Sequence, residues 1–169
     1  LVHRAHRFLK RFSLLVFNVA DETAAVDVVI ASVKGLYRIV EKAALRHDDR
    51  QGSCECILDI LRARLVYNND AGIGRALDSV GRCATVVRVK ERLADASRTP
   101  EGWGDVLVNL LIDGEEDEGS GVGYSQLIVE LQLVRQEMNE VNDSDSLQQL
   151  VTFRGIRELI TASGLALPR

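Results

Sequence analysis

Two stretches near the middle of the chain, read as strands, put a row of apolar residues on one face and a few polar residues on the other: GWGDVLVNLLID at Gly102–Asp113 and SQLIVELQL at Ser125–Leu133. A period of two is typical of a β-strand with one buried face. The opposite faces collect an aromatic ring, two carboxylates and two amides, from Trp103, Asp105, Asn109, Glu130 and Gln132. The alternation therefore predicts two strands of a sheet with an unusually functionalised polar face.

The flanking sequence predicts helices and further strands. Residues 1–17 have helical spacing, and an apolar stripe from Asp21 to about Leu45 predicts a second helix. ILDILRARLVY (57–67) predicts a turn and then a strand that includes Asp59, and ATVVRVKERL (84–93) predicts another strand. A short helix is expected between them in IGRALDSVGR (73–82). Helices are expected from about residue 134 to 166, with a break near NDSD (142–145).

This order of elements predicts an α/β (α+β) fold: a mixed sheet of four or five strands with helices packed on one face and the other face partly open. The last three strands have short connections and can pair antiparallel. We expect the apolar face of the sheet to bury Val87, Val106, Val108, Leu110, Val129 and Leu131.

Composition narrows the class of protein. The 169 residues, 46% of them hydrophobic, are sized for a single domain over 1–169. A net charge of −4 gives no overall attraction to nucleic acid or to an anionic membrane, so we expect neither as a partner. Three cysteines without a C-x-x-C pair argue against a disulfide framework and favour the reducing cytoplasm. Since the chain begins at Leu1, we expect it to be a piece of a longer protein.

Cations join the polar face of the predicted sheet. Three of them alternate along one strand, and Arg62 and Arg64 follow Asp59 on another. Arginine suits phosphate oxygens, carboxylates on separate strands suit Mg²⁺, and an aromatic ring can stack on a base. A phosphoryl-transfer site that binds a nucleotide uses all three kinds of side chain. A second interpretation stays open, because an antiparallel sheet with one solvated face shows the same alternation and carries mixed charges.

Four segments, LDILRARLVY, VVRVKERL, GWGDVLVNL and VELQL, resemble in order and spacing the synthetase (nucleotidyltransferase) domain of the RelA/SpoT family. The resemblance is to a divergent branch with the motifs D-x-x-R-x-x-x-V, V-x-R-x-K-x-R, G-Y-R-D-V-x-x-N-V and E-x-Q-L. It covers about residues 34–138, with flanking helices expected at 1–33 and 139–169. It implies a cytoplasmic transferase that moves pyrophosphate from ATP to the 3′-hydroxyl of GDP or GTP with Mg²⁺ as its cofactor. An RNA acceptor stays open.

Position within these motifs implies roles for individual residues. Asp59 and Glu130 match the catalytic acidic pair that holds Mg²⁺, and Glu130 would also activate the attacking hydroxyl. Two such carboxylates repel, so at least one is expected to have a raised pKa in the metal-free protein. The resemblance also implies a nucleotide-binding set, in which the tryptophan would stack on guanine: Arg38, Lys42, Arg64, Arg88, Lys90, Arg92, Trp103, Asn109 and Gln132.

The sequence departs from the family pattern at two points. No histidine follows the tryptophan in WGDVLVN, and Gly104 stands where the divergent branch has an arginine. The departures leave substrate identity and activity open, and two alternatives to an active transferase remain. One is a catalytically weakened relative that acts as a nucleotide-binding or protein-interaction module, and the other is a helical scaffold piece of a larger protein.

Overall fold

A computed structural model describes residues 2–44, 57–94, 104–114 and 126–141, together with the single positions 152, 156, 160 and 163. Its elements follow in the order α1 (Val2–Thr23), β1 (Asp27–Ile30), α2 (Leu36–Ala44), β2 (Arg62–Tyr67), α3 (Asp70–Cys83), β3 (Thr85–Glu91), β4 (Asp105–Asp113), β5 (Gln126–Arg135) and α4 (Gln136–Val141). Within these ranges no helix is both long enough and apolar enough to span a bilayer.

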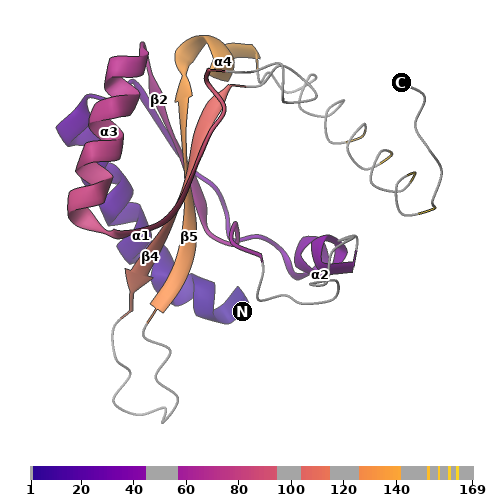
Figure 1. Cartoon of the computed structure of the whole chain (residues 1–169). Coiled ribbons are helices and arrows are strands. Elements are labelled where there is room, and N and C mark those ends of the chain that lie inside the picture. Colours follow the sequence, from indigo (N-terminus) through magenta and orange to yellow (C-terminus); the bar gives the residue numbers. More distant parts are fainter. Residues whose placement is uncertain are drawn as a thin grey trace.

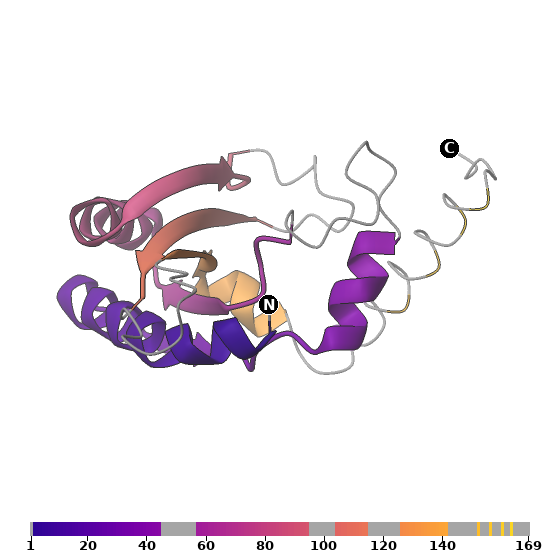
Figure 2. The same ribbon diagram turned by 90° about the horizontal axis from the view of Figure 1, so that it is seen from below.

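The strands form one five-stranded sheet in the order β1-β2-β5-β4-β3. β2 pairs parallel to β5, and the other neighbours pair antiparallel. Helices α1 and α3 cover one face of the sheet, and α2 lies on the opposite side (Figure 1; Figure 2). This mixed sheet confirms the predicted α/β (α+β) fold class and the antiparallel arrangement of the last three strands.

The core lies between the sheet and the two helices that cover it. Alternate residues of β2, β4 and β5 point into this layer, where they meet the apolar stripe of α1 around Phe12 and Val16. Five of the six predicted core residues are buried there: Val106, Val108, Leu110, Val129 and Leu131. At the end of this layer the Tyr67 hydroxyl lies 2.7 Å from Oγ1 of Thr23, which joins β2 to the last turn of α1.

The prediction that Val87 is buried is wrong, since its side chain is 50% exposed. The pairing of β3 with β4 shifts between Val86 and Arg88, so Val87 is the extra residue of a β-bulge. Every residue of this edge strand is exposed. After the bulge, Arg88 pairs with Asn109, and this pairing places Arg88 on the polar face as predicted.

The predicted helix from Asp21 to Leu45 is also wrong. Helix α1 continues to Thr23, Ala24 adopts a left-handed φ of 53°, and the chain then enters β1 before α2 begins. The run Val26–Ile30 has apolar residues at spacings that fit a helix, but it is rich in β-branched residues, which favour a strand. Pairing of β1 with β2 decides the outcome.

At the C-terminal end, β5 extends to Arg135, and α4 follows over six residues. Thr152, Ile156 and Ile160 are helical, in agreement with the predicted helices. The predicted break between these helices at residues 142–145 lies outside the described residues.

Packing of α3 on β2 gives a direct test of the core. A Cβ added to Gly72 would lie 2.7 Å from Cδ1 of the buried Tyr67, whereas one added to Gly74 in the same helix would meet nothing within 4 Å. We expect Gly72→Ala to lower the free energy of unfolding by about 1–3 kcal/mol, because the ring has little room to move. Gly74→Ala should raise it by about 0.5–1 kcal/mol through helix propensity. Urea unfolding measures both, and equal effects would contradict this packing.

Candidate functional site

Cross-strand registers gather the predicted site residues on the face of the sheet opposite α1 and α3. Residues paired in register share a face. One row across four neighbouring strands consists of Arg88, Asn109, Glu130 and Arg62. The next row consists of Lys90, Leu107, Gln132 and Arg64. The polar face inferred from the alternation is therefore a continuous surface in the structure.

Asp59 lies just before β2 rather than within it, which corrects its predicted place on the strand. The backbone N–H of Lys34 donates to the carbonyl of Ile60 at 3.0 Å, and this contact brings the segment after β1 beside Asp59. Oδ2 of Asp59 then accepts hydrogen bonds from the ammonium groups of both Lys34 and Lys42, the latter at 2.6 Å. The site thus gains Lys34, which was not among the predicted residues.

These contacts set the charge states. Burial by itself would raise the pKa of Asp59, but the hydrogen bonds from Lys34 and Lys42 outweigh it, and the pKa lies below its ordinary range. Burial, assisted by the nearby positive charge of Lys42, lowers the pKa of Lys34 to about 8 although Asp59 acts in the opposite direction. The Asp59 carboxylate is therefore ionised at neutral pH and already neutralised by cations from the chain itself.

The pKa of Glu130 shifts in the opposite direction to that of Asp59. The pKa of Glu130 is raised, first by burial and then by the negative charge of Asp59, while Lys42, Lys34 and Arg62 oppose the rise. The carboxyl makes no hydrogen bond or ion pair with any other residue in the described part of the chain. The pKa of one carboxyl of the pair is thus raised as expected, but burial contributes more than the predicted repulsion between the two carboxylates.

Asn109 lies beside Glu130 in register and leaves a polar atom without a partner. Its side chain is 5% exposed, yet its Nδ2 has no hydrogen-bond partner among the residues that the structure describes. An unpaired buried amide destabilises a fold by about 1–3 kcal/mol. Such groups are found where a ligand or ordered water completes the hydrogen bonding.

A polar network extends from the second row to Arg92, which follows β3, and to Asp105, which begins β4. Asp105 is 0% exposed, and Arg92 binds it in bidentate fashion, Nε to Oδ1 at 2.5 Å and Nη2 to Oδ2 at 2.6 Å. Gln132 Nε2 donates to the same Oδ2 at 2.6 Å, and Gln132 Oε1 accepts from Nε of Arg64 at 3.0 Å. Arg64 reaches on to Asn139 of α4 at 2.9 Å. The guanidinium of Arg92 is thus directed at Asp105.

The remaining predicted residues divide into three groups. Arg88 and Lys90 are exposed on the edge strand and belong to the polar face. Arg38 is exposed on α2 and pairs with Glu41 of the same helix. Trp103 lies outside the described residues. Sequence reasoning placed Arg62 on this face without assigning it a role, and it missed Lys34, whose only signal is a lysine within the largely apolar run 28–40.

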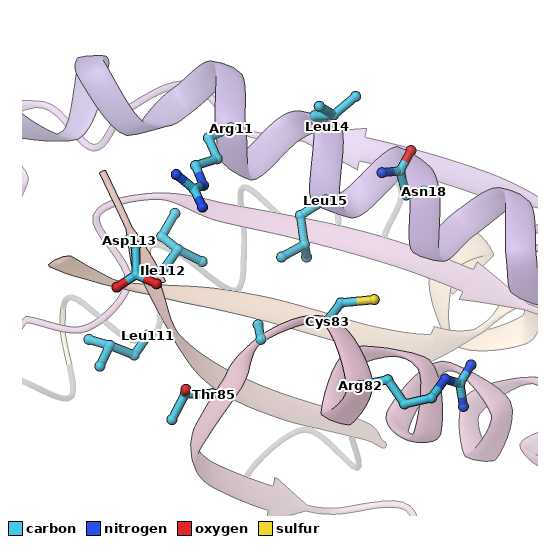
Figure 3. Close-up of a pocket in the computed structure, with 11 residues that line it drawn as sticks. Arg11, Leu14, Leu15, Asn18, Arg82, Cys83, Thr85, Leu111, Ile112 and Asp113 are labelled. Atoms are coloured by element: carbon cyan, nitrogen blue, oxygen red, sulfur yellow. The ribbon is translucent and has the colours of Figure 1, made fainter. Parts of the chain in front are cut away.

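A separate groove of about 540 Å³ lies on the helix-covered side of the sheet. Figure 3 shows its lining, in which Arg11 and Asn18 come from α1, Cys83 ends α3, and Thr85 begins β3. None of the described site residues lines this groove. The candidate site is therefore an open sheet face and not the groove.

The raised pKa of Glu130 predicts a pH-dependent effect of Glu130→Gln on stability. A carboxyl whose pKa is higher in the folded than in the unfolded state binds its proton more tightly when folded. The carboxyl's contribution to the stability of the folded state is fully present below its unfolded-state pKa. This contribution is lost as the pH rises through the folded-state pKa. We therefore expect the melting temperature of Glu130→Gln, minus that of the unmutated protein, to increase by roughly a few degrees from pH 4 to pH 7. A pH-independent difference would contradict the environment described for Glu130.

Known proteins resemble this chain in structure and not in sequence. No protein-family model and no curated protein sequence matches the chain. Small alarmone synthetase 1 from Bacillus subtilis bound to its product pppGpp matches in structure, with a TM-score of 0.63 and 19% identity over 95% of this chain and 92% of that chain. The same enzyme bound to AMPCPP matches with a TM-score of 0.56 and 16% identity, over 97% of this chain and 78% of that chain.

A third match comes from another organism. A GTP pyrophosphokinase family protein from Streptococcus pneumoniae gives a TM-score of 0.61 and 15% identity, over 96% of this chain and 90% of that chain. These alignments cover 95–97% of this chain. The chain therefore has the RelA/SpoT-like fold of the small alarmone synthetases, as the motifs in its sequence predicted.

Proposed function

We propose that this chain transfers a pyrophosphoryl group from ATP to the 3′-hydroxyl of a guanine nucleotide, with Mg²⁺. The main support is the convergence of Asp59 and Glu130 on a sheet face lined with cations, next to the unpartnered amide of Asn109. Structures with this fold hold pppGpp in one case and AMPCPP in another. The sequence motifs that led to the fold prediction include both carboxylates.

The reaction needs a base and a cation-rich phosphate site. The acceptor's 3′-oxygen attacks the β-phosphorus of ATP, the bond between that phosphorus and the α,β-bridging oxygen breaks, and its electron pair leaves with AMP. Glu130 accepts the hydroxyl proton. Its raised pKa brings it closer to neutral pH, where a general base works best. Nδ2 of Asn109 donates to an oxygen of the acceptor, which gives this buried nitrogen the missing partner.

The residues present fit Mg²⁺. Magnesium takes hard oxygen ligands, keeps several waters and is held in such sites by one or two carboxylates together with substrate phosphates. Asp59 and Glu130 supply two carboxylates, and no cluster of three or more histidine, cysteine or acidic side chains exists in the ranges described. When bound, the metal would neutralise charge on the phosphates.

Arg88 and Lys90 would hold the phosphates of ATP, because they are exposed cations on the same face as Glu130. We expect Arg88→Ala or Lys90→Ala to weaken ATP binding by about 1.5–3 kcal/mol for each lost charge-assisted contact. Arg75→Ala is the matched control, since Arg75 is exposed on α3 across the sheet. Calorimetric titration with ATP measures all three. Unchanged affinity in both β3 variants would remove this strand from the site.

Labelled ATP tests the proposed function. The protein is incubated with ATP labelled in its β- and γ-phosphates, Mg²⁺, and GDP, GTP or no acceptor. We expect label to appear in a new guanine nucleotide only when acceptor and Mg²⁺ are both present. Release of label as free phosphate or pyrophosphate with every acceptor would contradict the proposal.

A second function is favoured by a specific observation. Asp59 is already paired with two lysines, and Gly104 and the missing histidine leave the site with fewer reactive groups than the motif provides. The same surface then serves as a nucleotide-binding or protein-interaction module. Saturable binding of ATP or GTP without any labelled product, in the experiment above, would select this alternative.

A further inference from the structure

Two lysines from different segments converge on one oxygen of Asp59. Lys34 follows β1, Lys42 belongs to α2, and both ammonium groups donate to Oδ2, while Asp59 comes from the loop before β2. The side chains of Lys34 and Asp59 are 9% and 13% exposed, so this contact is largely removed from water. Two like charges on one oxygen repel each other strongly unless negative charge balances them. Asp59 and Glu130 provide that balance.

The charges match those of a divalent ion. Two ammonium groups carry the charge of one Mg²⁺, and they lie against a carboxylate oxygen of the kind that Mg²⁺ uses. The lysine ammonium groups and Mg²⁺ cannot all occupy Oδ2 fully at once, since an ammonium hydrogen bond and a metal bond compete for the same oxygen. Binding of one must therefore weaken binding of the other.

We propose that Lys34 and Lys42 act as tethered counter-ions that occupy Asp59 and compete with Mg²⁺ for its carboxylate. This inference rests on the proposed function, because it takes Asp59 as a metal ligand. Metal binding then releases two cations beside the site where the phosphates would lie. Coupling free energies between linked binding events are typically about 1–3 kcal/mol, which corresponds to about 5–150-fold in affinity.

Mg²⁺ affinity without nucleotide tests the competition. Titration calorimetry with MgCl₂ at fixed ionic strength compares the unmutated protein with Lys34→Met and Lys42→Met. Lys42 is half exposed, so its variant tests the inference even where loss of the buried Lys34 amine impairs folding. Lys10→Met is the control, because it removes the same charge from an exposed position of α1 across the sheet. We expect Mg²⁺ to bind about 5–150-fold more tightly to the two site variants and within about twofold to the control.

The melting temperature gives a second readout. Mg²⁺ should raise it more in Lys42→Met than in the unmutated protein, because the vacated oxygen is open to the metal. Equal or weaker Mg²⁺ binding in the folded variants, or no binding in any of them, would overturn the inference. If the unmutated protein still forms the labelled nucleotide in that case, the proposed function survives. If the variants bind Mg²⁺ more tightly but no product forms in any assay, the proposed transfer fails and the competition stands.

Discussion

Arg92→Met is expected to lower the free energy of unfolding by about 3–5 kcal/mol, because it removes the bidentate guanidinium from the fully buried carboxylate of Asp105. The amide of Gln132, which also donates to that carboxylate, stays in place. In a chain of this size the change corresponds to a fall in melting temperature of roughly 6–20 °C. Thermal and urea unfolding measure it.

Arg135→Met provides a matched control. Arg135 also binds an aspartate, Asp70, through two guanidinium nitrogens, but the side chains of that pair are 38% and 55% exposed. An exposed ion pair contributes about 0–1 kcal/mol, so this variant should remain close to the unmutated protein. Similar losses in the two variants would show that burial does not distinguish the pairs. A stable Arg92→Met with weakened ATP binding would return Arg92 to the predicted set of nucleotide ligands.

Glu130→Gln is expected to lower the turnover of the proposed transfer by about 10²–10⁴-fold, because the amide cannot accept the hydroxyl proton. The substitution keeps the shape of the side chain, and the raised pKa of Glu130 means that its ionised form is disfavoured by the fold. The melting temperature at neutral pH should therefore be unchanged or higher. Rates of product formation and thermal unfolding are measured on the same preparations.

Glu137→Gln is the control for this substitution, since Glu137 is exposed on α4. Its turnover should equal that of the unmutated protein. Equal turnover in Glu130→Gln and Glu137→Gln would exclude Glu130 as the base, whatever the reaction proves to be. A lower melting temperature of Glu130→Gln at neutral pH would argue that the carboxylate serves to hold the fold.

Alternation was enough to predict β4 and β5, because each has a row of apolar residues against the helices and polar residues on the opposite face. It failed at β1 because the spacing of Val26, Val29 and Ile30 fits a helix as well as a short strand. It also failed at Val87, since a β-bulge inserts a residue without a mark in the local pattern. Both outcomes depend on pairing with another strand, which a local period does not encode.

In the candidate site, too, the sequence predicted some features, and others depend on tertiary contacts. The motifs located Asp59 and Glu130, but the contact of Lys34 with Asp59 joins residues 25 positions apart through backbone pairing after β1. Arg92 and Asp105 were both placed on the polar face, yet their bidentate pair depends on where β3 meets the start of β4. Sequence thus indicated which side chains share the face, and tertiary contacts decided which of them are free to meet a ligand.

The most direct test of pyrophosphoryl transfer is the identity of the product that ATP leaves behind. With Mg²⁺ and a guanine acceptor, the unmutated protein is predicted to form AMP and pyrophosphorylated acceptor in equal amounts, and Glu130→Gln is predicted to form neither at a comparable rate. Chromatographic quantification of all adenine and guanine nucleotides measures both. Formation of ADP in place of AMP, or of AMP without a modified acceptor, would contradict the proposed transfer.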